Sequence, residues 1–122
     1  MNDRVHLRLR YADAVLTGND ITGVWPRCTA WLIRLALEHA MNQLWTASHP
    51  EMAQCPMRAQ LLTLGAVVDT DTQHRVSELW RTLSRAGHHH HYELSPTTAE
   101  LRRWLAEARI LVTRLENAAG SP

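Results

Sequence analysis

The feature that most constrains the fold is the spacing of apolar residues near the end of the chain. Between positions 101 and 115 they recur every three or four residues without interruption, and the opposite face carries arginine and glutamate. This spacing places the apolar side chains on one side of an α-helix, whereas a half-buried strand would alternate. The segment therefore predicts a helix with one face on a hydrophobic core. Its apolar positions are Leu101, Trp104, Leu105, Ala108, Leu111, Val112 and Leu115.

Two start points are open for this last helix. Ser95 can act as the N-cap with Pro96 at the first helical position, where the missing N–H of proline costs nothing. Alternatively, Thr97 and Glu100 have the spacing of a capping box. We expect residues 118–122 to fray.

Helical spacing also predicts a first helix over residues 3–16 and a second over about 25–46. The second segment is apolar around most of its girth, which is typical of a central helix. For the first helix the expected apolar stripe is Val5, Leu9, Ala12 and Leu16. In the second helix one apolar face is formed by Val24, Cys28, Trp31 and Leu35, and it is widened greatly by Leu32, Leu37, Met41, Leu44 and Trp45.

A short helix is expected over 57–67, and residues 69–72 (DTDT) offer N-cap candidates for the next helix. That helix carries a stripe formed by Val76, Leu79, Trp80 and Leu83, and it ends near Gly87 or continues to about Tyr92.

The sum is an all-α chain. We expect a single domain over residues 1–122, built as an up-and-down four-helix bundle with one additional short helix. No alternating strand pattern, internal repeat or low-complexity tract is present in the sequence.

The net charge does not predict a strongly charged binding partner. The net charge is +1, and all 13 basic residues are arginine. Arginine suits phosphate recognition, but the near balance of acids favours a plain compositional bias. Cys28 and Cys55 form neither a disulfide framework nor a metal-type spacing, so we expect small buried side chains in a reducing cytoplasm. The N-terminal segment lacks a signal-type apolar core, and no apolar run reaches membrane-spanning length.

Candidate catalytic or metal-binding side chains are concentrated only around four consecutive histidines, in RAGHHHHYELSP at 85–96. Three interpretations are open. In the first, the histidines are structural and suit the negative end of a helix dipole. In the second, His88 and His91, three apart, share a face and bind a metal together with Glu93 and with His39 of the second helix.

The third interpretation is acid–base cleavage of RNA without a metal. Such a site needs an imidazole to move a proton and a cation to hold the scissile phosphate. Arg85 and a histidine five positions later supply both groups. Arg81, seven positions before His88, is an alternative cation.

An arginine followed after four to six residues by a histidine, late in a small helical bundle, resembles the HEPN superfamily. Here Arg85 and His90 match the two ends of the motif, and His91 satisfies the looser spacing. The resemblance implies a homodimer in which two motifs meet in a cleft. It also implies a metal-independent ribonuclease, often a toxin of a toxin–antitoxin or defence system with a cognate antitoxin. Other members of the superfamily only bind RNA or partner proteins.

The resulting hypothesis is an RNA-cleaving or RNA-binding protein of the cytoplasm, with no cofactor, no metal and no membrane partner. Arg85 and His90 are the expected catalytic residues, and Trp80 is the expected interface aromatic of a homodimer. Two alternatives stay open: a non-catalytic dimeric interaction module and a His-rich metal-binding bundle. The expected supporting residues are His88, His89, His91 and Tyr92.

Overall fold

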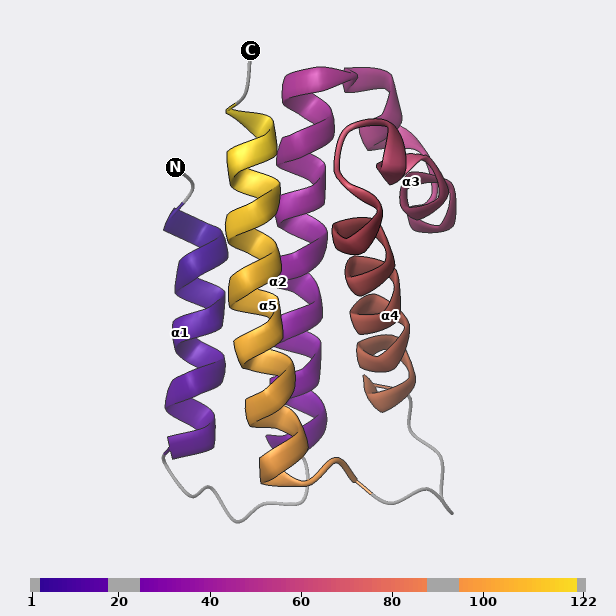
Figure 1. Cartoon of the computed structure of the whole chain (residues 1–122). Coiled ribbons are helices and arrows are strands. Elements are labelled where there is room, and N and C mark those ends of the chain that lie inside the picture. Colours follow the sequence, from indigo (N-terminus) through magenta and orange to yellow (C-terminus); the bar gives the residue numbers. More distant parts are fainter. Residues whose placement is uncertain (1–2, 18–24, 88–94, 121–122) are drawn as a thin grey trace.

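The computed structural model describes residues 3–17, 25–87 and 95–120, and these residues contain helices and no strand. Figure 1 shows the long helices side by side, with the chain running alternately down and up the molecule and the short α3 beside the start of α4. The expectation of an all-α chain is confirmed. The elements are α1 (Asp3–Thr17), α2 (Trp25–Ser48), η1 (Pro50–Gln54), α3 (Met57–Thr63), η2 (Leu64–Ala66), α4 (Thr70–Gly87) and α5 (Thr98–Ala119).

The core lies around α2 and α5, which share the most extensive contact between any two helices. Helices α1 and α4 each pack against both of them. The expected apolar face of α5 is confirmed at every position except Trp104, which is only half-buried. Its buried residues are Leu101, Leu105, Ala108, Leu111, Val112 and Leu115.

The face of α2 that meets the core confirms part of the expected apolar surface, since Leu37, Met41, Leu44 and Trp45 are buried. The line expected at Cys28, Trp31 and Leu35 does not face the core. Cys28 is exposed, Leu35 is half-buried and the Trp31 side chain is 50% exposed. Because α2 is apolar around most of its girth, periodicity alone cannot decide which side faces inward. The opposite side of α2 faces the core, because its alanines let neighbouring helices approach closely. The buried residues there are Ala30, Ile33, Ala36, Leu37, Ala40, Met41, Leu44 and Trp45.

The cysteines are likewise not the buried pair that was expected, since Cys28 is exposed and Cys55 half-buried, and both are free. Among the described residues, no helix is both long enough and apolar enough to cross a bilayer.

The helix ends follow local signals. The Thr97 hydroxyl accepts a hydrogen bond from the Glu100 backbone N–H, and the Glu100 carboxylate accepts one from the Thr97 backbone N–H, which completes the capping box. Asp69 caps α4 by accepting a bond from the Thr72 backbone N–H at 3.1 Å. Helix α5 continues through Ala119, so fraying at 118–119 was wrong. Whether α4 extends toward Tyr92 lies outside the described residues.

Candidate functional site

Arg85 lies in the last described turn of α4 and its side chain is exposed. It forms no ion pair or hydrogen bond with any residue in the described ranges. Arg81, the alternative cation, pairs with Glu78 at 3.3 Å on the same helix. Among the described residues, Arg81 therefore has an acidic partner and Arg85 has none.

The position of Arg85 follows from how α4 packs. Val76, Leu79 and Leu83 are buried, which fixes the inner side of the helix. Because residues four apart share a side of a helix, Arg81 and Arg85 project together from the outer part. The other site residues expected from the sequence lie outside the described residues, so their approach to Arg85 is not described. They are His88, His89, His90, His91 and Tyr92.

A groove of about 640 Å³ lies between α3 and α4, within the range of about 300–1,000 Å³ that is usual for ligand pockets. Its apolar wall is formed by Leu61, Leu62 and Trp80, and none of its lining residues is acidic. The remaining lining residues are basic or polar: Arg58, Gln73, His74, Ser77 and Arg81.

The two walls of this groove are tied together by Gln73 of α4. Its side-chain amide donates hydrogen bonds to the backbone carbonyls of Leu61 and Leu62, at 3.3 and 3.2 Å. Gly65 makes room for this amide, since a Cβ at that position would lie 2.6 Å from Gln73 Oε1. These bonds fix the end of α3 against α4 beside the groove.

Trp80 is fixed by a hydrogen bond on its polar edge. Its indole Nε1 donates to Glu38 Oε2 of α2 at 2.8 Å, and Glu38 also lies 3.6 Å from Arg34 Nε. The bond sets the orientation of the ring and gives Glu38 a structural task. The expected role of Trp80 at a homodimer interface stays a prediction.

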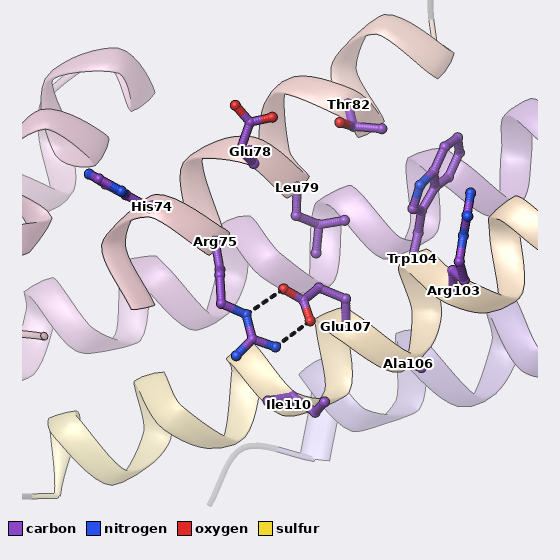
Figure 2. A pocket seen from close by; sticks show the side chains of 10 residues that line it. All are labelled: His74, Arg75, Glu78, Leu79, Thr82, Arg103, Trp104, Ala106, Glu107 and Ile110. Carbon is purple, nitrogen blue, oxygen red and sulfur yellow. Dashed lines mark hydrogen bonds and ion pairs between the residues drawn. The ribbon is translucent and has the colours of Figure 1, made fainter. Parts of the chain in front are cut away.

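A second groove, of about 580 Å³, runs between α4 and α5. Figure 2 shows Arg75 of α4 and Glu107 of α5 facing each other there, with Trp104 beside Arg103 at one end. Arg75 donates two hydrogen bonds to the Glu107 carboxylate, at 2.8 and 2.5 Å. This bidentate pair holds the pKa of Glu107 below its usual range. Burial acts in the opposite direction but offsets only part of this effect.

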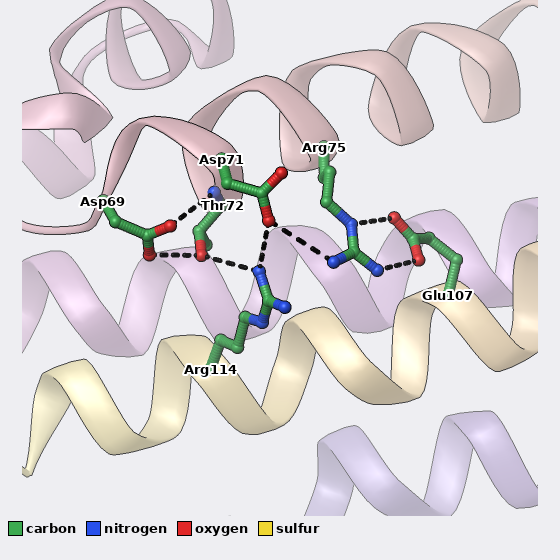
Figure 3. A network of polar contacts seen from close by, with 6 residues as sticks. All are labelled: Asp69, Asp71, Thr72, Arg75, Glu107 and Arg114. Atoms are coloured by element: carbon green, nitrogen blue, oxygen red, sulfur yellow. Dashed lines mark hydrogen bonds and ion pairs between the residues drawn. The ribbon is translucent and has the colours of Figure 1, made fainter.

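The pair belongs to a network that fastens the first half of α4 to α5 (Figure 3). Asp71 accepts hydrogen bonds from Arg114 at 2.8 Å and from Arg75 at 3.4 Å, and the Arg114 bond is the main reason why the pKa of Asp71 is lowered. Arg114 also donates to the Thr72 hydroxyl at 3.1 Å, and that hydroxyl lowers the pKa of Asp69. These carboxylates are ionised and occupied at neutral pH, so they are structural groups and poor candidates for acid–base chemistry.

The histidine of α2 that was expected to join a metal site has another contact. Arg8 Nη1 lies 3.2 Å from His39 Nδ1, so this ring nitrogen accepts a hydrogen bond from a cation. Burial, and then the charges of Arg8 and Arg4, lower the pKa of His39. Within residues 3–17, 25–87 and 95–120, no three histidine, cysteine or acidic side chains converge as metal ligands would.

The groove residues Arg58 and Leu62 were missed at the sequence level. Leu62 carried a faint signal, because it is one of two adjacent leucines in a seven-residue helix that can bury only one side. Its side chain is 74% exposed, whereas that of Leu61 is 9% exposed.

Comparisons of the chain with protein-family models, with curated proteins and with solved structures find no match.

Proposed function

We propose that this protein is a HEPN-like RNA-cleaving or RNA-binding protein, an up-and-down helical bundle that acts as a homodimer on RNA. The observation that carries the proposal is the exposed Arg85 guanidinium, which has no acidic partner among the described residues. Support comes from the adjacent α3–α4 groove, whose lining contains two arginines and no acid. The setting we propose is a cytoplasmic toxin–antitoxin or defence system with a cognate antitoxin.

The chemistry assigns different tasks to the two ends of the motif. Arg85 binds the non-bridging oxygens of the scissile phosphate and stabilises the charge that develops on them. His90, as a neutral imidazole, accepts the proton of the ribose 2′-hydroxyl while this oxygen attacks the phosphorus. The P–O5′ bond breaks, the leaving 5′-oxygen takes up a proton, and the products are a 2′,3′-cyclic phosphate and a 5′-hydroxyl.

The decisive experiment is cleavage of a mixed transfer and messenger RNA pool in excess EDTA. Wild type, Arg85→Ala and His90→Ala are purified identically, with Arg103→Ala as the matched control because Arg103 is an exposed arginine of α5 outside the α3–α4 groove. We expect wild type and Arg103→Ala to yield fragments ending in 2′,3′-cyclic phosphate. Removing either motif residue should slow cleavage by about 10²-fold or more. Cleavage that requires a metal, or that survives Arg85→Ala, contradicts the mechanism.

A non-catalytic dimeric interaction module is the second candidate, and one observation favours it. Large apolar side chains are exposed on α1 and α2, with Tyr11 55% and Trp31 50% exposed. Such side chains at a surface are typical of protein contacts. This alternative predicts a dimer by sedimentation analysis that Trp31→Ser dissociates, no RNA cleavage by wild type, and an unchanged dimer in Arg85→Ala.

A further inference from the structure

Two grooves flank α4, and their charges distinguish them. The α4–α5 groove contains Glu78 and Glu107, and Arg75, its arginine on α4, is paired with the Glu107 carboxylate. Among the described residues that line the α3–α4 groove, the charged ones are Arg58 and Arg81, and Arg81 is also paired at the surface with Glu78. A polyanion is therefore favoured in the α3–α4 groove and opposed by a carboxylate in the other.

The α3–α4 groove is also the one that leads to Arg85. Arg81 lines it and lies one helical turn before Arg85, which corresponds to a rise of about 6 Å along α4. A strand whose phosphate contacts Arg85 can thus place the neighbouring phosphate near Arg81 without a change of direction.

The apolar wall suits a nucleobase. Trp80 is half-buried, and its orientation is set by the hydrogen bond to Glu38, while Leu62 extends the apolar surface from the α3 side. Proteins that hold single-stranded nucleic acid combine aromatic side chains, on which bases stack, with a basic groove that follows the phosphates. Stacking needs an unpaired base, so a base in this groove comes from a single strand rather than from a duplex.

We infer that the α3–α4 groove holds one unstacked nucleotide of a single-stranded RNA, next to the phosphate bound by Arg85. The base lies against Trp80 and Leu62, and Arg58 and Arg81 bind the flanking phosphates. This inference rests on the proposed function and extends it by naming a second subsite and the single-stranded form of the substrate.

The test measures binding separately from cleavage. A short fluorescein-labelled RNA of mixed sequence carries a 2′-O-methyl group on every ribose, so it cannot form the cyclic phosphate. Its fluorescence anisotropy is titrated with wild type, Arg58→Glu and Arg103→Glu. The two substitutions make the same change of charge on exposed helix positions, but only Arg58 lines the α3–α4 groove. We expect binding to weaken about tenfold in Arg58→Glu and less than about threefold in Arg103→Glu.

Two substitutions of Trp80 test the base contact. We expect Trp80→Leu to weaken binding about fivefold or more, while Trp80→Phe retains most of the affinity because an aromatic face remains. Circular dichroism melts identify any loss caused by unfolding, and the Phe variant decides the question if the Leu variant is unstable. The same RNA annealed into a blunt duplex should bind more weakly than the single strand.

The outcomes separate the two proposals. Equal losses in Arg58→Glu and Arg103→Glu overturn the groove assignment, even if wild type cleaves RNA through Arg85. Groove-dependent binding without any cleavage supports the subsite and removes the nuclease. Absence of binding by wild type overturns the subsite, as does a change of oligomeric state in Arg58→Glu with unchanged RNA affinity, because a second copy would then cover the groove.

Discussion

Replacing Leu62 by alanine should leave stability nearly unchanged, whereas the same change at Leu111 should be costly. Leu111 is fully buried on α5, and Leu62 on α3 is 74% exposed. A buried Leu→Ala change loses the transfer free energy and leaves a cavity, which together cost about 3–4 kcal/mol. At Leu62 only about a quarter of the side chain is removed from water and no cavity forms, so the expected cost is about 0.5 kcal/mol.

The assay is urea unfolding followed by circular dichroism at a helix-sensitive wavelength, with thermal melts alongside. For a domain of this size, we expect Leu111→Ala to lower the melting temperature by about 12–16 °C and Leu62→Ala by about 2 °C. Because Leu62 also lines the α3–α4 groove, Leu62→Ala should weaken RNA binding at nearly full stability. Equal destabilisation by both substitutions would refute the packing of α3 described above.

Three further predictions concern polar contacts. Thr97→Ala removes half of the capping box of α5 and should cost about 1 kcal/mol in urea unfolding, with Thr98→Ala as the neighbouring control. Because its bond to Arg75 lowers the pKa of Glu107, the stability this carboxylate contributes is present above the unfolded value of 4.5 and is lost as the pH falls through the lower folded value. Glu107→Gln should therefore lose less stability than wild type between pH 7 and pH 3 in denaturant titrations, and identical pH profiles would contradict this. Gly65→Ala should displace the Gln73 amide and speed hydrogen exchange in α3, whereas Gly120→Ala, where a Cβ meets nothing closer than 3.6 Å, should not.

The structural features that depend on residues close together in the sequence were predictable from it. The apolar face of α5 is read from a strict helical spacing, and Thr97 with Glu100 carries its own start signal. The inner face of α2 was only partly predicted, because a helix with apolar residues on nearly every side offers no periodic contrast. Trp31 was therefore left open between the core and a dimer contact, and half of its surface is exposed.

The candidate site likewise has one part that was predictable from local sequence and one part that was not. Exposure of Arg85 follows from the α4 stripe, because a residue off the buried positions of a helix faces outward. The α3–α4 groove was not predictable, since it arises where Gln73 reaches carbonyl groups more than ten positions earlier in the chain. Contacts of this kind depend on the packing of the whole molecule and leave no local pattern.

The bond between Gln73 and the end of α3 has a kinetic consequence. Because it joins the two walls before any ligand arrives, neither wall has to be assembled during the encounter. Stopped-flow traces should then show a single phase whose rate rises linearly with concentration and does not level off at the rate of an internal rearrangement. Under the proposed function, the association with RNA is then limited by the encounter and not by a rearrangement of the two walls.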